Sequence, residues 1–197
     1  MIIEIEGIDG VGKTTQCELL RDHFRQQGKK AVVVKDLEST KFGRDIKEFL
    51  TSSESQSMEV ELFSFLACKS QLFSQVITPA VSCGEIVICD RGIGSFISYF
   101  ESLGFSRSFL CDVINLAING LRPQLTIFLD VMVEETSKRK ANKLEQSKFD
   151  LMSDDFFRKQ RAVFLSLSKE SSWAVIDGSL SIKETHLLIT RYVGNIL

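Results

Sequence analysis

The chain has 197 residues, the length of one ordinary domain, and it contains 24 Lys and Arg against 26 Asp and Glu. The net charge of −2 argues against a protein that binds nucleic acid through bulk positive charge. Apolar runs are short and interrupted by charged residues, so we expect no segment that crosses a membrane. No basic segment precedes a signal-like apolar core near the start, so we expect a cytoplasmic protein.

Cysteine and histidine are too few and too scattered to support metal or hydrolase chemistry. The 5 cysteines include no C-x-x-C pair and no zinc-ligand spacing, and their mostly apolar neighbours indicate small core residues. The two histidines, His23 and His186, are far apart in the sequence. The sequence therefore excludes a His/Cys metal cluster and a Ser/His hydrolase.

Strand-like and helix-like patterns alternate along the chain. Short β-branched or apolar runs predict strands over 2–6, 31–34, 86–89, 125–129 and 173–176. Apolar residues at helical spacing predict helices over 13–27, over 56–82, from the third strand to Leu121 with a break near Gly104, from about residue 134, and over 154–169 and 182–192. Pro79 is expected to kink or end the long helical stretch.

This alternation predicts an α/β fold with a five-stranded parallel sheet, right-handed crossovers and helices on both faces. No internal repeat, Pro/Gly linker or low-complexity tract divides the chain, so we expect residues 1–197 to form one domain. The stretch 51–57 and the charged segment around residue 140 are expected to be loops or mobile lids within it. The lid is expected over about 138–153.

A phosphate-binding loop is predicted after the first strand. Residues 7–14 read Gly-Ile-Asp-Gly-Val-Gly-Lys-Thr, a full match to G-x-x-x-x-G-K-[ST] between a predicted strand and a predicted helix. The glycines let backbone N–H groups wrap a phosphate at the helix N-terminus. In such a loop Lys13 reaches the β- and γ-phosphates of a nucleotide, and the hydroxyl of Thr14 coordinates Mg²⁺. The alternative is a Gly-rich turn without a ligand.

Charged residues at the predicted strand ends indicate what else this site holds. Asp9 places a carboxylate inside a loop built for phosphate, which suits a hydroxyl or a cation on an acceptor molecule. Asp90 and Arg91 follow an apolar strand, and ligands bind at the carboxyl ends of parallel strands. Asp90 can hold Mg²⁺ through water, and Arg91 can clamp a second phosphate with two N–H groups. The same two residues could also form a surface ion pair.

A run of basic residues follows the fourth predicted strand: Lys138, Arg139, Lys140, Lys143 and Lys148. Such a run is most often a solvated helix face. Alternatively, the segment is a lid that brings cations over a transferring phosphoryl group and excludes water, as small-molecule kinases require. The residues alone leave both interpretations open.

Over nearly the whole chain these residues resemble the thymidylate kinase family. The family's F-x-A-x-R-x-x-(Q/H) helix is similar to Phe65-Leu66-Ala67-Cys68-Lys69-Ser70-Gln71, and its D-R-x-x-x-S strand end to Asp90-Arg91-Gly92-Ile93-Gly94-Ser95. Its R-P-D-L and L-D-V stretches are similar to Arg122-Pro123-Gln124-Leu125 and Leu129-Asp130-Val131. Ser147-Lys148-Phe149-Asp150 lies where the family carries its D-R-x-E lid.

The resemblance implies a set of site residues. ATP would be bound by Gly7, Ile8, Asp9, Gly10, Val11, Gly12, Lys13, Thr14 and Thr15, and Mg²⁺ would be held at Thr14 and Asp90. The acceptor dTMP would be bound by Lys35, Phe65, Lys69, Arg91, Ser95 and Tyr99. The groups that act in phosphoryl transfer would be Lys13, Asp9, Arg91, Arg139, Lys143 and Lys148.

Within this set the resemblance also implies specific roles. Phe65 would stack on the thymine, and Lys69 would approach its carbonyl edge. Asp9 would face the acceptor sugar, and Tyr99 lies where the family often places an aromatic residue near the sugar 2′ position. On residue type alone, Phe65 and Tyr99 could equally be core residues. Family members with arginine in the phosphate loop carry less basic charge in the lid; because Val11 stands there, the lid would have to supply that charge.

The sequence departs from the family pattern at three arginines. Where the family has its R-E-P-G-G segment, this chain has Lys35-Asp36-Leu37-Glu38-Ser39. Lys69 stands in place of the family's base-reading arginine, and Lys148 stands in place of its lid arginine. These changes keep a positive charge but lose the paired hydrogen bonds of a guanidinium. They bear on the identity of the substrate more than on the type of reaction.

The expected activity is transfer of the γ-phosphoryl group of MgATP to dTMP, which needs positioning and charge neutralisation rather than a strong base. One alternative is another nucleotide or nucleoside kinase, accepting dUMP, dCMP or a nucleoside. Another is an ATP-binding regulatory module with a relic acceptor site. Family members are commonly homodimers, and the apolar stretch 58–76 is either a candidate interface or ordinary core.

Overall fold

The computed structural model describes residues 1–52, 56–140, 149, 151–171 and 173–196. Its strands are β1 (Ile2–Glu6), β2 (Ala31–Val34), β3 (Ile86–Asp90), β4 (Leu125–Asp130) and β5 (Ala174–Asp177). They form a parallel sheet in the order β2-β3-β1-β4-β5. The predicted α/β fold and its five parallel strands are confirmed, with strand ends that differ from the prediction by at most one residue.

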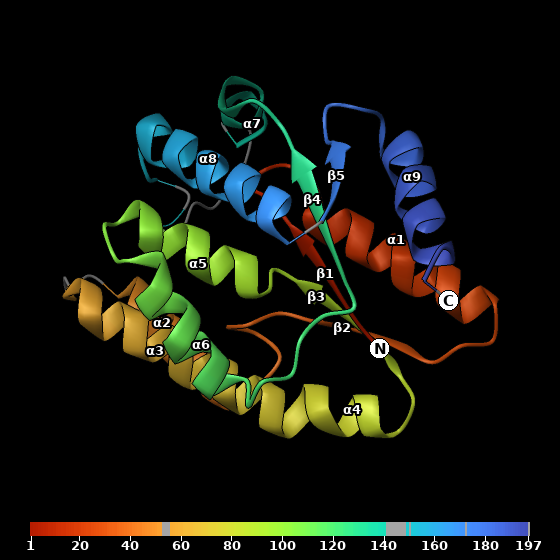
Figure 1. Ribbon diagram of the computed structural model, residues 1–197, viewed down its shortest axis with the longest axis horizontal. Helices are drawn as coiled ribbons and strands as arrows, with labels where there is room; N and C mark the ends of the chain where they lie inside the picture. The colour runs from red at the N-terminus through yellow and green to blue at the C-terminus, as the bar shows by residue number, and fades with distance from the viewer. Residues whose placement is uncertain (53–55, 141–148, 150, 172, 197) are drawn as a thin grey trace.

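Helices lie on both faces of this sheet (Figure 1). They are α1 (Lys13–Gln26), α2 (Lys41–Thr51), α3 (Met58–Leu72), α4 (Thr78–Ser82), α5 (Ile93–Ser102), α6 (Arg107–Ala117), α7 (Val133–Lys140), α8 (Asp154–Glu170) and α9 (Ile182–Gly194), with a π-helix, η1 (Phe73–Ile77), between α3 and α4. α1 and α9 lie on one side of the sheet, and α3, α5, α6 and α8 lie on the other.

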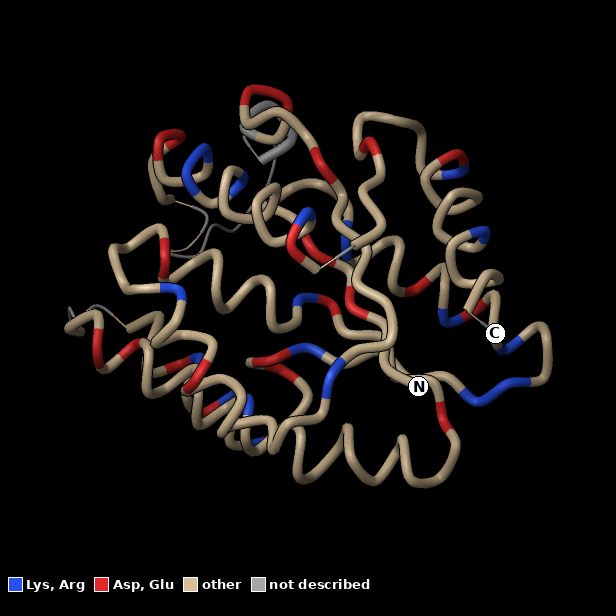
Figure 2. Tube along the Cα trace, in the orientation of Figure 1, with Lys and Arg blue, Asp and Glu red and all other residues tan. Residues whose placement is uncertain are grey.

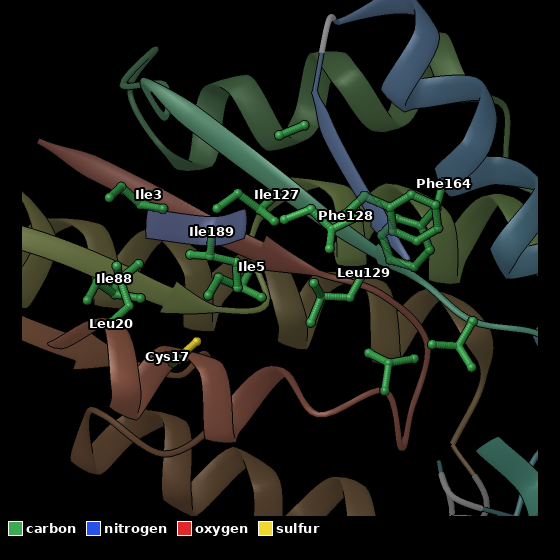
Figure 3. Packing of buried hydrophobic residues seen from close by; sticks show 14 of the residues in the cluster. Ile3, Ile5, Cys17, Leu20, Ile88, Ile127, Phe128, Leu129, Phe164 and Ile189 are labelled. Carbon is green, nitrogen blue, oxygen red and sulfur yellow. The ribbon is translucent and has the colours of Figure 1, made fainter. Parts of the chain in front are cut away.

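β1 contacts a different layer with each of its two faces, because successive side chains of a strand alternate. Ile3 and Ile5 join a buried apolar cluster with Cys17 and Leu20 of α1 (Figure 3). The other face carries Glu4 and Glu6, whose carboxylates accept hydrogen bonds from the start of α5. On that same side, Phe128 of β4 stacks on Phe164 of α8 with ring centroids 5.2 Å apart.

The strand order places the carboxyl ends of β1 and β3 side by side. Ile5 is in register with Asp90, so the loop after β1 begins next to the residues that follow β3. β1 pairs with β3 on one side and β4 on the other, so the chain changes direction across the sheet at this point. Ligands bind at such switch points, outside the carboxyl ends of the strands.

Two helical features differ from the sequence prediction. α2 was not predicted, and it begins at Thr40, whose hydroxyl accepts a hydrogen bond from the N–H of Gly43 at 2.9 Å. The long stretch 58–82 is helical as predicted, but it neither ends nor breaks at Pro79. Instead the chain passes through η1 before Pro79 enters the first turn of α4, where a missing N–H is tolerated.

α5 approaches the segment that enters β5 very closely. A Cβ placed on Gly94 would lie 2.4 Å from the indole ring of Trp173. The ring therefore packs directly on the backbone of α5, next to Ser95. Glycine is required at position 94 because of this contact, rather than because of its backbone conformation.

Acidic and basic residues are interspersed along the trace (Figure 2). This distribution agrees with the near-zero net charge of the sequence. Among the described residues, no helix combines the length and the apolar character needed to span a bilayer.

Candidate active site

The loop between β1 and α1 has the backbone that phosphate binding requires. Gly7, Gly10 and Gly12 have φ angles of 146°, 88° and 96°, which residues other than glycine rarely adopt. A Cβ on Gly7 would lie 2.7 Å from the carbonyl oxygen of Leu129, so this glycine is also required by space. Gly12, the residue just before α1, offers no side-chain cap. The first N–H groups of α1 are thus left to a ligand, and an anion suits them.

The side chain of Lys13 folds back onto the phosphate loop. Its Nζ donates a hydrogen bond to the carbonyl oxygen of Ile8 at 2.8 Å, and the residue is buried. Burial lowers the pKa of Lys13 to about 8, helped by the charge of Arg91 and opposed by the carboxylates of Asp9 and Asp90. An ammonium in this setting gains most from a partner with several negative charges, such as a polyphosphate.

Thr14, Asp90 and Lys35 meet beside the loop. The hydroxyl of Thr14 donates to Oδ2 of Asp90 at 2.5 Å, and Nζ of Lys35 lies 3.7 Å from the same oxygen. A hydroxyl and a carboxylate are hard oxygen ligands, and Mg²⁺ is usually bound by one or two such groups together with substrate phosphates. Thr14 and Asp90 therefore fit the predicted magnesium site. Among the described residues, no cluster of three His, Cys, Asp or Glu side chains forms a self-contained metal centre.

Asp9 and Arg91 form an ion pair that joins the phosphate loop to the end of β3. Arg91 has a φ of 76°, which is unfavourable for a residue with a side chain, and its N–H donates to the carbonyl of Ile5 at 3.2 Å. Its Nη1 also lies 3.4 Å from the hydroxyl of Ser95. Backbone strain of this kind is typical of functional sites, where the surrounding contacts hold it in place. The structure therefore brings together three of the predicted residues.

Glu6 of β1 holds the start of α5, which follows Arg91. One carboxylate oxygen accepts the N–H groups of Gly92 and Ser95, each at 2.9 Å, and the other accepts the hydroxyl of Ser95. Burial raises the pKa of Glu6, and the hydrogen bonds from Ser95 act against this rise. A carboxylate at a helix N-terminus is favourable for charge as well as for hydrogen bonding. Glu6 thus fixes the backbone that directly follows Arg91.

Aromatic rings gather where the acceptor base was predicted. Phe65 of α3 and Tyr99 of α5 have ring centroids 6.1 Å apart, and Phe149 lies 5.9 Å from Phe65 and 5.8 Å from Tyr99. The hydroxyl of Tyr99 donates to Oε2 of Glu61 at 3.0 Å, and burial raises the pKa of this phenol. Phe65 and Tyr99 are partly buried and pack against an apolar core cluster.

Lys69, whose role was predicted together with that of Phe65, lies in the interior of the protein. The family resemblance implies that its ammonium approaches the thymine carbonyl, but in the structure the ammonium is buried and lies 2.7 Å from a carboxylate oxygen of Asp36. The two residues lie on α3 and on the turn after β2.

Comparison with known proteins agrees with this geometry. The sequence model of the family described as Thymidylate kinase matches residues 5–189. The chain belongs to the thymidylate kinase family. A thymidylate kinase from Kosmotoga olearia is 33% identical over 195 residues, covering 97% of this chain and 94% of that protein. A thymidylate kinase from Thermosipho melanesiensis is 32% identical, covering 100% and 99%, and a probable thymidylate kinase from Pyrococcus abyssi is 33% identical, covering 93% and 91%.

The segment predicted to form a lid in this member of the thymidylate kinase family is described only in part. Lys138, Arg139 and Lys140 occupy the last turn of α7, but their side chains lie outside the described part of the chain. Lys143 and Lys148 also lie outside the described residues.

Four residues of the site were missed by the sequence analysis: Glu6, Glu61, Phe149 and Asp36. A signal for Glu6 is visible, since Glu4 and Glu6 alternate with isoleucine in a strand that leads into a phosphate loop. A signal for Glu61 is also visible, since it lies one helical turn before Phe65 on α3. No local pattern distinguishes Asp36 or Phe149, because their roles depend on contacts with distant elements.

Proposed function

We propose that the protein is a thymidylate kinase that transfers the γ-phosphoryl group of ATP to dTMP, giving dTDP and ADP. The observation that carries this proposal is the intact phosphate loop lying directly against the Asp9–Arg91 pair at the end of β3. A nucleotide bound by the loop and an acceptor bound beside Arg91 would then lie close to each other. Family membership along residues 5–189 supports the identity of the acceptor.

On the donor side, the residues of the loop bind ATP through backbone N–H groups, from Gly7 to Thr15. Lys13 contacts the β- and γ-phosphates and neutralises the charge that develops as the phosphoryl group leaves. For this it exchanges its hydrogen bond with Ile8 for phosphate oxygens. Its partial loss of hydration in the folded protein favours that exchange.

Thr14 and Asp90 would hold Mg²⁺, which would supply positive charge that offsets the negative charge of the phosphates. Asp90 is held in position by Thr14 and by Lys35 from the two neighbouring elements. The hydrogen bond between Thr14 and Asp90 also links the phosphate loop to the end of β3.

On the acceptor side, Lys35 and Arg91 hold the monophosphate, and Asp9 faces the sugar. Phe65 stacks on the thymine, and Ser95 and Tyr99 line the pocket. Glu61 fixes the Tyr99 hydroxyl, which keeps the ring beside the platform formed by Phe65. Phe149 covers the same aromatic group from the lid side.

Arg139, Lys143 and Lys148 supply cations from the lid at about 138–153, and they compensate for Val11, which carries no charge in the loop. A closed lid also excludes water, which would otherwise compete with dTMP for the phosphoryl group. The whole chain, residues 1–197, acts as a single domain in the cytoplasm.

The protein acts as a homodimer that associates through the stretch 58–76 on α3 and η1. This stretch exposes Met58, Val60 and Phe63, and the exposed fraction of Phe63 is 61%. Val60 and Phe63 are one helical turn apart, and exposed apolar side chains that lie together can mark interaction surfaces.

The test is a panel of monophosphates, assayed by ADP release with the purified chain and MgATP. We expect dTMP to give the highest kcat/KM, with dUMP tolerated because a methyl group contributes no more than about 1–3 kcal/mol in an apolar pocket. Preference for dCMP would show a different monophosphate kinase. ATP binding without turnover of any monophosphate would show an ATP-binding module.

A further inference from the structure

Lys69 is a cation placed inside the protein. It lies on α3 one helical turn after Phe65, and its side chain is 2% exposed. Its Nζ lies 2.7 Å from Oδ1 of Asp36, whose side chain is 11% exposed. To reach a bound base, the ammonium would have to leave a buried carboxylate without its counter-ion, which is strongly unfavourable.

Asp36 belongs to the turn that follows β2, and the residue before it is Lys35. Lys35 reaches Asp90 at 3.7 Å and Glu38 at 3.4 Å, so its ammonium lies at the edge of the active site. The turn is closed by Ser39, whose hydroxyl accepts the N–H of Lys35 at 2.8 Å. Lys35, a cation of the active site, is therefore directly followed by Asp36, which ties the turn to the protein interior.

A second carboxylate, Glu4 of β1, acts on Lys69 from the sheet. Burial, together with the charge of Glu6, raises the pKa of Glu4 to about 7, although the charge of Lys69 acts to lower it. Burial would lower the pKa of Lys69, but the carboxylates of Asp36 and Glu4 outweigh this and raise it. Lys69 therefore remains charged, and its charge links α3 to the turn after β2 and to β1.

We propose that Lys69 is a positioning residue: its ion pair with Asp36 holds the turn after β2 against α3 and so sets the distance from Lys35 to the acceptor phosphate. The base is then selected by the aromatic group of Phe65, Tyr99 and Phe149 rather than by the charge at position 69. This inference rests on the proposed function, because it assigns Lys35 to the acceptor phosphate.

The experiment compares the parent with Lys69→Met, with the double variant Lys69→Met/Asp36→Asn, and with Lys159→Met as a matched control. Lys159 is an exposed lysine of α8 with no role in the site. For each protein, kcat and KM are measured for dTMP and for dCMP at saturating MgATP, and thermal unfolding is followed separately. Turnover of dTMP by the parent is measured first, so failure of the proposed function is detected before any variant is compared.

We expect Lys69→Met to raise the KM for dTMP and for dCMP together, by about tenfold, because both share the phosphate contact. The dTMP-to-dCMP ratio of kcat/KM stays within about twofold of the parent ratio. The double variant is impaired no more than the single one, because it leaves no unpaired buried carboxylate. It also provides the measurement if Lys69→Met alone does not fold. Lys159→Met behaves as the parent.

Two outcomes would overturn the proposal. If the dTMP-to-dCMP ratio changes by more than about fivefold, Lys69 contacts the base. If thermal stability falls while the KM for both monophosphates is unchanged, the ion pair has a structural role alone and does not position Lys35.

Discussion

Lys13 has the clearest single-residue consequence in the proposed mechanism. We expect Lys13→Ala to lower kcat/KM for dTMP. The expected loss of transition-state stabilisation is about 3–4 kcal/mol, which is typical for one preorganised charge contact. Folding is retained, because Lys13 is the first residue of α1 and is not part of the apolar clusters. Steady-state kinetics and thermal unfolding check both statements, with Lys41→Ala on α2 as the control. Turnover within about threefold of the parent would contradict the assignment.

Glu4 predicts how stability depends on pH. Its ordinary pKa of 4.5 is raised to about 7 in the folded protein, chiefly by burial. Between these values the folded state binds more protons than the unfolded state, so the free energy of unfolding falls as the pH rises through this range. We expect Glu4→Gln to remove about 1–3 kcal/mol of this fall between about pH 5 and pH 8. Urea unfolding at several pH values measures it, and identical pH slopes for both proteins would contradict it.

Individual residues also show where sequence reasoning stops. Lys13 and Thr14 were predicted because they belong to a motif whose spacing is fixed by the loop itself, and Asp90 was predicted because it ends an apolar strand. The surroundings of Lys69 could not be predicted, because its counter-ions come from β1 and from the turn after β2. Burial of a charge is a property of several packed elements, and no local pattern encodes it.

At the scale of elements, α7 and the segment after it carry the proposed lid. We expect Arg139→Ala to lower kcat more than it raises the KM for dTMP, because the charge is needed as the phosphoryl group moves. Initial-rate kinetics at varied dTMP separate the two effects. The same substitution is made at Lys143 and Lys148; unchanged kcat in all three variants would mean that the run is a solvated helix face.

The elements also differ in how well their patterns could be recognised. The strands and α1, α8 and α9 bury many residues, so their apolar spacing is regular and predicts them. α2 carries Phe42, Ile46, Phe49 and Leu50 at helical spacing, so a signal for it was present in the sequence and was missed, although Phe42 and Phe49 stay exposed. At Pro79 the chain avoids a break because η1 shifts the hydrogen bonding just before it, an adjustment that depends on packing along the whole stretch.

At the scale of the whole molecule, the exposed apolar side chains of α3 predict association. We expect Phe63→Glu to weaken dimerisation by at least about tenfold, because it places a charge in an apolar contact. Leu187→Glu on α9 is a matched control, since Leu187 is equally exposed, at 62%, on a helix of the opposite face. Sedimentation over a range of protein concentrations gives the dissociation constants. Equal constants for both variants, or a monomeric parent, would contradict the interface.

The contact between Trp173 and Gly94 gives the protein a built-in optical reporter. Trp173 is the chain's single tryptophan, and its ring rests on α5 one residue from Ser95, which Arg91 contacts. Indole emission responds to small changes in the packing and polarity around the ring. We therefore expect added dTMP to change the fluorescence of the unmodified protein in a saturable way, and we expect Trp173→Phe to abolish the signal. A flat titration by an active enzyme would mean that α5 keeps its place as the acceptor binds. Binding of the acceptor can in this way be followed without turnover and without an attached label.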